Sequence, residues 1–295
     1  MFRAAMRLAR PAAFLLASLS LVACVASAGA LNPTPPPSSA PDPVDPNTPV
    51  FRVRWEGGFV TPEMLLGRLP IVVVYADGRV ITQGPVPAIY PGPLMPNLQE
   101  RTISAAALER LIELAREKNL LRTVHYDYPG IADAPDTVLE IELDGTSYRV
   151  SAYALAEAAI DLSAGGLDQA AIDGRAALRE FIDALTGIPA SDFVDVEHPY
   201  AFDGLRIYAG KAVVVPNSEL PGEQPAVDWP LEDLATAGDP VDNSPLEVRC
   251  QVVDGEDLDE VLPLLQAANS LQTFRSGDEL YSLTVVPLYP GETGC

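Results

Sequence analysis

Two runs of β-branched residues, each interrupted by an Asp-Gly pair, limit this chain most strongly to a fold with antiparallel strands. IVVVYADGRVIT spans residues 71–82, and TVLEIEL and TSYRVSAY flank Asp144-Gly145. Asp-Gly between apolar runs favours a tight turn, because glycine adopts positive φ without steric cost, and Asp77-Gly78 suits a type I′ turn. Both runs therefore predict β-hairpins.

Apolar residues at helical spacing predict helices after these strands. A short helix is expected with Thr61 as its N-cap and Pro62 as its first position, running to Leu69, and a longer one from Ser104 to about Asn119. Ser104 is the predicted N-cap of the longer helix. The apolar stripe of that helix is Leu108, Leu111, Ile112 and Ala115, and that of a third helix, ending at Gly187, is Leu178, Phe181, Ile182 and Leu185.

The C-terminal third partly repeats this order. Strands are expected at 204–215, 246–253 and 280–286, with a helix near 258–271. A proline disrupts a helix interior, so Pro263 requires that this helix begin near Asp259. We predict the α+β class with mostly antiparallel sheets and packed helices, in two similar-sized domains at 50–190 and 198–295. One continuous sheet is the alternative.

The N-terminal segment has the layout of an export signal. Residues 1–23 carry Arg3, Arg7 and Arg10 and no acid, and the apolar run from Ala12 to Ala23 follows. A membrane-spanning helix needs roughly 20 apolar residues, so this run is short for one. We expect export out of the cytoplasm.

Cys24 ends this apolar run and resembles the lipidated residue of bacterial lipoproteins. Leu21-Val22-Ala23-Cys24 resembles a lipobox, in which a peptidase cuts before a cysteine that carries diacylglycerol. Ala26-Ser27-Ala28 offers a competing cut for ordinary signal peptidase. Two or more acyl chains give stable anchoring. The expected partner is thus the membrane, through a lipid on the extracytoplasmic face of the cell membrane.

A spacer separates this anchor from the folded part. Residues 33–49 contain eight prolines among Ser, Thr, Asn and Asp, so residues 24–49 are expected to form an extended linker. At about 3.1 Å per residue this linker reaches on the order of 80 Å. It would hold the folded part away from the bilayer.

The charge of the chain disfavours nucleic acid as a partner. The sequence has 41 acidic and 19 basic residues, and loss of the three signal arginines leaves 16 basic residues and a net charge of −25. Binding a phosphate backbone requires clustered Lys and Arg. The acidic surface is typical of a protein kept soluble by its charge.

Two cysteines remain after lipidation, Cys250 and Cys295. An even pair outside the cytoplasm usually forms a disulfide, and this one would fix the C-terminal tail. Free thiols are the alternative.

Catalytic motifs are scarce in this sequence. It contains two histidines, His125 and His198, and it lacks G-x-S-x-G, H-E-x-x-H, glycine-rich phosphate loops and paired C-x-x-C. A hydrolase using His125 with Asp127 or Asp133 is the enzymatic alternative. We expect no catalysis and no cofactor.

HYDYPGIADAPDT, residues 125–137, is the most unusual segment. It gathers the candidate binding residues His125, Tyr126, Asp127, Tyr128, Asp133 and Asp136. Its acids fall at relative positions 1, 7 and 10, which differ from an EF-hand loop, so no metal site is predicted. The competing interpretation is structural: the aspartates shape turns and the tyrosines cover the core.

The loop around Tyr90 is a second region where aromatic and proline residues could form a recognition patch or cover a sheet edge.

Several of these segments together resemble one group of bacterial proteins. The signal and proline spacer, VVVYADGRVIT, HYDYPGIADAPDT with YRVSAYAL, and YSLTVVPLYPG are similar to a group of uncharacterised bacterial lipoproteins, most familiar from high-GC Gram-positive bacteria. The resemblance covers most of the mature chain and implies the lipid anchor, but it implies no activity. The expected role is a non-catalytic binding module for another envelope component, with a protease-inhibitor or sensor-like interaction domain as a further alternative.

Overall fold

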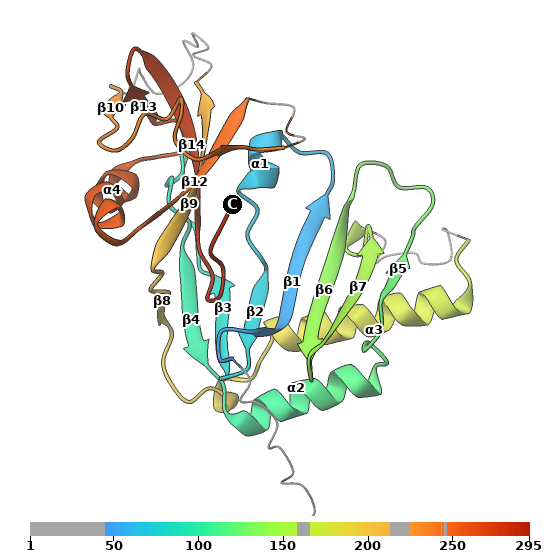
Figure 1. Cartoon of the computed structure of the whole chain (residues 1–295). Helices are drawn as coiled ribbons and strands as arrows, with labels where there is room; N and C mark the ends of the chain where they lie inside the picture. Colours follow the sequence, from blue (N-terminus) through green and yellow to red (C-terminus); the bar gives the residue numbers. More distant parts are fainter. Residues whose placement is uncertain (1–44, 158–165, 213–224, 243, 245–246) are drawn as a thin grey trace, which may run out of the picture. The chain divides into compact units, whose positions relative to one another are not determined.

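The computed structural model describes residues 45–157, 166–212, 225–242, 244 and 247–295, which form two β-sheets and four α-helices. The predicted signal and Cys24 lie outside these residues. The predicted α+β class is confirmed. Figure 1 shows α2 and α3 beside the first sheet and α4 beside the second.

The first sheet has eight strands in the order β5-β7-β6-β1-β2-β3-β4-β8, and only the β5–β7 pair among them is parallel. Its strands are β1 (Pro49–Gly57), β2 (Val72–Tyr75), β3 (Arg79–Gln83), β4 (Leu98–Thr102), β5 (Val124–Tyr126), β6 (Pro135–Leu143), β7 (Thr146–Tyr153) and β8 (His198–Pro199). The predicted hairpins are therefore confirmed as β2–β3 and β6–β7.

The second sheet has six strands in the order β10-β13-β14-β9-β12-β11, antiparallel apart from the β10–β13 pair. These strands are β9 (Gly204–Lys211), β10 (Val227–Asp228), β11 (Asp239–Pro240), β12 (Val248–Asp254), β13 (Thr273–Ser276) and β14 (Glu279–Pro287). The helices of the fold are α1 (Pro62–Leu66), α2 (Ala105–Glu117), α3 (Gln169–Thr186) and α4 (Gly255–Ala267).

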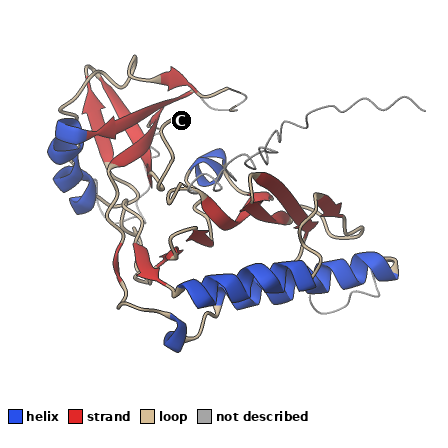
Figure 2. Cartoon of the chain, turned by 60° about the horizontal axis from the view of Figure 1, so that its bottom comes forward, coloured by secondary structure: helices blue, strands red, loops and turns tan. Residues whose placement is uncertain are grey.

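Helix α2 and helix α3 cover one face of the first sheet with the apolar stripes expected from the sequence. Leu108, Leu111, Leu178 and Leu185 are buried, and the rings of Phe51 and Phe181 meet edge to face at 5.1 Å between centroids. Both predicted N-caps form: Ser104 Oγ accepts from the amide of Ala107, and Thr61 Oγ1 accepts from that of Met64. Figure 2 shows the helices along one side of the strands.

Two local predictions are wrong. Asp77 lacks the positive φ that a type I′ turn requires at both central residues, and only Gly78 has it, at φ 92°. Gly78 is still required, since a Cβ there would lie 2.6 Å from the carbonyl oxygen of Ile103. Helix α4 begins at Gly255, before Asp259, so Pro263 lies inside it. Gly255, at φ 53°, turns β12 directly into the helix, which is why the helix starts early.

Besides the apolar core of each sheet, one apolar cluster contains side chains from both sheets. Val73, Tyr75 and Ile81 come from the first sheet, and Val286 and Tyr289 come from β14 and the residues after it. The eight-stranded sheet also includes β8, which pairs with β4. Residues 43–295 form one compact unit that holds both sheets, and their division into domains near residues 190–198 stays a prediction.

Candidate binding surfaces

The residues of the first sheet alternate between its two faces. Phe51, Val53 and Val150 point into the helix-covered core, so the residues alternating with them point to the other side. The strand register places Arg54, Val138, Ser151 and His125 in one row across β1, β6, β7 and β5. The predicted candidate residue His125 therefore belongs to this face.

His125 contacts two polar side chains through a single ring nitrogen. Its Nδ1 lies 2.9 Å from Ser151 Oγ and 3.4 Å from Asp136 Oδ1, and its side chain is 52% exposed. A Ser-His-Asp relay uses opposite nitrogens of the ring, one for the nucleophile and one for the orienting carboxylate. This arrangement lacks that separation. It fixes the imidazole to the sheet.

The two aspartates considered for hydrolysis have other partners. Asp127 Oδ1 accepts a hydrogen bond from the amide of Tyr128 at 2.8 Å. Asp133 has φ 62°, and its carbonyl accepts from the amide of Phe59 at 2.9 Å. Both observations match the turn-shaping role expected of aspartate. Among the described residues, no group of three or more His, Cys, Asp or Glu side chains is placed to hold a metal ion.

Tyr126 and Tyr128 are buried and belong to the packing of the fold. A Cβ at Gly174 of α3 would lie 2.1 Å from the Tyr126 hydroxyl, so this glycine lets the tyrosine approach the helix. The Arg175 guanidinium lies 5.2 Å from the Tyr128 ring centroid. Of the six candidate residues, the structure thus presents His125, Asp127 and Asp133 at the surface, leaves Asp136 half-buried and covers both tyrosines.

Arg175 organises this region, although the sequence gives it no motif. It is 1% exposed, and its guanidinium donates to the carbonyls of Tyr126, Tyr153 and Ala154 at 2.8–3.3 Å. Burial lowers the pKa of this guanidinium, with the neighbouring Arg179 adding to the effect. The buried cation ties the 126–128 segment to the end of β7.

A ring of four ion pairs lies beside His125 on the same face. Arg54 contacts Glu56 and Glu140, each at 2.7 Å, and Arg149 contacts the same two carboxylates at 2.6 and 3.2 Å. Two positive and two negative groups cancel in this ring. Such partly exposed pairs each stabilise by about 0–1 kcal/mol.

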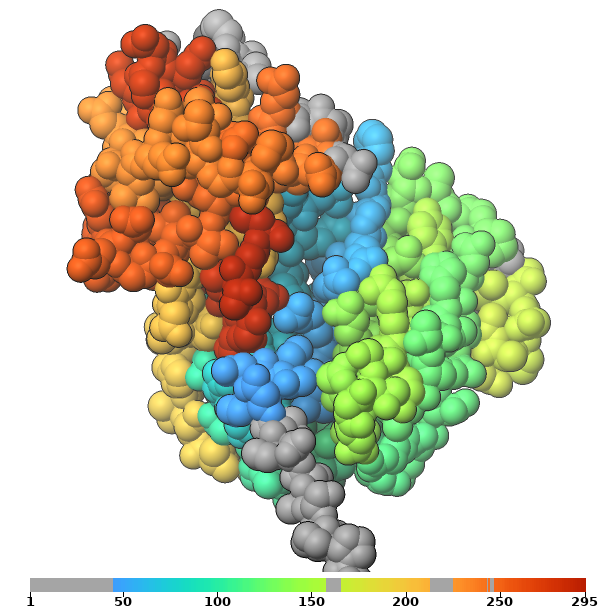
Figure 3. Space-filling model, viewed as in Figure 1, coloured from blue at the N-terminus to red at the C-terminus, as the bar shows by residue number. Residues whose placement is uncertain are grey.

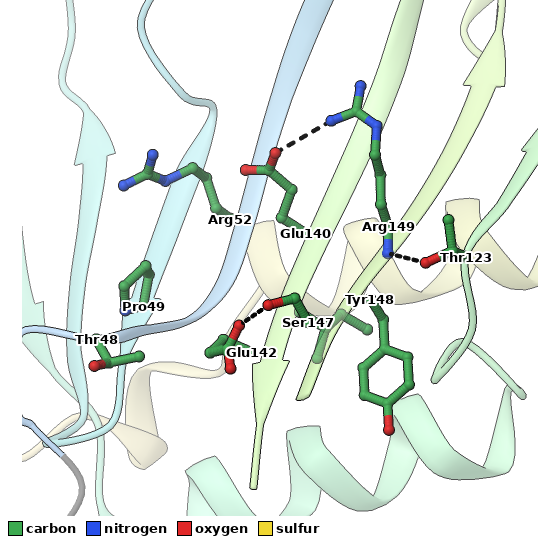
Figure 4. A pocket seen from close by; sticks show the side chains of 10 residues that line it. Thr48, Pro49, Arg52, Thr123, Glu140, Glu142, Ser147, Tyr148 and Arg149 are labelled. Carbon is green, nitrogen blue, oxygen red and sulfur yellow. Dashed lines mark hydrogen bonds and ion pairs between the residues drawn. The ribbon is translucent and has the colours of Figure 1, made fainter. Parts of the chain in front are cut away.

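A hollow of about 620 Å³ adjoins this ring (Figure 4). Figure 4 shows Glu140 directed toward Arg149, with Arg52 on the neighbouring strand, and Ser147 directed toward Glu142. Thr48, Thr123 and Tyr148 complete much of the wall. Glu140 pairs with Arg149, Arg52 pairs with Glu292 outside the hollow, and Glu142 accepts from Ser147. With two arginines and two glutamates in its wall, the hollow favours neither anions nor cations.

An apolar groove of about 470 Å³ forms between α1, the proline-rich loop of residues 85–96 and β14. Its apolar side chains include Met64, Val86, Leu94, Met95, Leu283 and Val285. Met64 is 59% and Val86 65% exposed, and Ile89 and Tyr90 of the same loop are also exposed. Large apolar side chains gathered at one surface mark interaction sites.

The proline-rich loop is held at both of its ends. Asn97 Nδ2 donates to the Pro85 carbonyl at 2.9 Å, and the Gly84 amide donates to the Asn97 carbonyl at 2.8 Å. Farther along, the Leu94 amide donates to Ala268, and the Ser270 amide donates to Gly92. The five prolines of the loop restrict its backbone further. The exposed part from Val86 to Tyr90 is thus presented on a constrained backbone.

Comparisons with known protein families, with curated proteins and with solved structures each found no match to this chain. Within the described residues, every helix falls short of the length or hydropathy needed to cross a bilayer. The similarity to bacterial lipoproteins stays a prediction.

Proposed function

We propose that this chain is a non-catalytic binding module, held by a lipid on Cys24 at the extracytoplasmic face of the cell membrane, that binds a protein of the cell envelope. The apolar groove, which we take as its binding site, is the observation that carries this proposal. A binding module needs exposed apolar side chains that a partner can bury, and Met64 and Val86 provide them.

The geometry around His125 supports the non-catalytic part of this proposal. A general base acts on a nucleophile within hydrogen-bond reach while a third group orients it from the other side. Ser151 and Asp136 instead share Nδ1 of His125, and Ser151 is buried. These contacts favour a structural role for the imidazole over a catalytic one.

A protein partner fits the groove better than the lipid surface does. The mature chain carries a net charge of −25, so an anionic headgroup layer repels it. The linker expected at residues 24–49 would add reach on the order of 80 Å. A partner some distance above the bilayer is thus accessible to the groove.

Site-specific photo-crosslinking in intact cells tests this proposal. A photoreactive residue is placed at Val86, and in separate samples at Val194 and Val196, which are exposed valines outside the groove. We expect a discrete crosslinked protein from position 86 and none from positions 194 and 196. Equal products from all three positions, or a lipid adduct from position 86, would contradict the proposal.

A further inference from the structure

We infer that the groove binds an extended polypeptide segment whose apolar side chains are flanked by Lys or Arg. This inference rests on the proposed function, because it names the partner chemistry of the same site. Three independent features of the groove support it: its charge, its balance of hydrogen-bond donors and acceptors, and the constrained backbone of its loop.

The charge of the groove wall is negative. Glu63 is the one charged side chain among the described residues that line the groove, and it is exposed on α1. The rest of the chain adds a strong negative field, with 41 acidic against 19 basic residues. Complementary charge steers a partner and suppresses wrong ones. Lys or Arg beside the apolar anchor residues supplies that complement.

The hydrogen-bonding groups of the loop point to the same partner chemistry. Residues 85–96 contain five prolines among twelve residues, so the backbone carries twelve carbonyl acceptors and seven N–H donors. Hydrogen bonds within the protein occupy the carbonyls of Pro85, Pro87 and Gly92 and the amides of Ile89 and Leu94, and acceptors remain in excess. Lys and Arg are pure donors, with three and five N–H groups. A partner rich in these residues satisfies an acceptor-rich loop, whereas one rich in Asp or Glu leaves acceptors facing acceptors.

The constrained loop lowers the cost of binding an extended segment. Its backbone is tied to residues 97, 268 and 270 before any partner arrives. Ordering that is already present in the free protein does not have to be supplied during association. The apolar floor contributed by Leu283 and Val285 lies on β14, a central strand of the second sheet, so it is rigid as well.

A second copy of the chain is a poorer occupant. Two copies each carry a net charge of −25, and their grooves each present Glu63. Like charges facing each other across an interface are unfavourable. The chemistry of the groove therefore favours a partner of opposite charge over self-association.

Selection of peptides from a random library on the full chain tests the inference. Bound peptides are sequenced, and their affinities are measured for the wild type, for M64S/V86S in the groove and for V194S/V196S outside it. We expect enriched peptides to combine apolar residues with net positive charge and to bind M64S/V86S about tenfold more weakly, which corresponds to about 1.4 kcal/mol. V194S/V196S should bind them as the wild type does.

A charge-reversed pair of variants isolates the electrostatic part. Glu63→Lys should weaken the binding of the selected peptides and reduce the dependence of their affinity on salt concentration. Glu117→Lys, at an exposed position of α2, should change neither quantity. Enrichment of acidic or uncharged peptides, equal binding by M64S/V86S, or a dimer that M64S/V86S abolishes would overturn the inference. If position 86 crosslinks a protein in cells while basic peptides are not selected, the proposed function stands and this inference fails.

Discussion

The guanidinium of Arg52 on β1 lies 3.1 Å from the carboxylate of Glu292 near the C-terminus. The same carboxylate contacts Arg206 of β9 at 3.5 Å, so one glutamate joins a strand of each sheet. Figure 3 shows the C-terminal segment beside β1. The Tyr200 hydroxyl also donates to the Leu288 carbonyl, and Arg206 Nε donates to that of Gly294.

The disulfide between Cys250 and Cys295 secures this C-terminal segment, as the sequence predicts. Replacing both cysteines with serine should lower the free energy of unfolding by roughly 4 kcal/mol, because the unfolded chain regains the freedom of a long loop. Urea denaturation of wild type and variant under non-reducing conditions measures the difference. Glu292→Gln, which keeps the disulfide, should cost about 1 kcal/mol or less. Equal losses for both variants would contradict a role for the covalent link.

Arg175→Leu should destabilise the chain by about 3 kcal/mol, because three buried carbonyls lose their donor. The matched control is Arg116→Ala on α2, which removes an exposed ion pair with Glu113 and should change stability by about 0.5 kcal/mol or less. Thermal or urea denaturation measures both. A loss for Arg175→Leu no greater than that of the control would show that Arg175 does not organise the 126–128 segment.

Three buried tyrosines predict a loss of stability at alkaline pH. Burial raises the pKa of Tyr75, Tyr200 and Tyr289 well above the ordinary value of 10.0. A raised folded-state pKa means that their stabilising contribution is full below about pH 10 and is lost as the pH rises above it. Urea denaturation between pH 8 and 11, with tyrosinate absorbance recorded in parallel, measures this. Ionisation of all ten tyrosines near pH 10 without loss of structure would contradict it.

The proposed lipidation of Cys24 predicts a specific N-terminal mass. Protein purified from its own cells should begin at Cys24 and carry the mass of a diacylglycerol and its thioether link. Mass spectrometry of the N-terminal peptide measures this directly, and a Cys24→Ala variant should lack the added mass. A mature chain that begins at Gly29 would show that the competing signal-peptidase site is used instead.

Local patterns in the sequence predicted much of the fold because the features they encode are local. The stripes of α2 and α3, the N-caps at Thr61 and Ser104 and the two hairpins depend on residues within a few positions of each other. Short strands such as β5 and β8 form only through pairing with β7 and β4. A strand of two or three residues is too short to show a periodic pattern in the sequence.

The candidate binding sites were harder to predict from the sequence than the fold, because they depend on tertiary structure. The sequence singled out His125 and its neighbours by composition, yet Tyr126 and Tyr128 are buried because Gly174 and Arg175 of α3 accept them. The groove joins Met64, Val86 and Leu283, which are far apart in the sequence. The density of proline and apolar residues around Tyr90 is the one local signal of the groove, and the same density is also explained by the covering of a sheet edge.

The proposed function requires that a partner binds in the groove, and the affinity of the partner recovered by crosslinking at position 86 tests this requirement most directly. Purified wild-type chain, Val86→Asn and Val196→Asn are titrated with that partner by calorimetry. An unpaired amide in place of an apolar side chain that the partner buries should cost about 2 kcal/mol, so Val86→Asn should bind about 30-fold more weakly, while Val196→Asn binds as the wild type does. Equal affinity of all three chains would contradict the account.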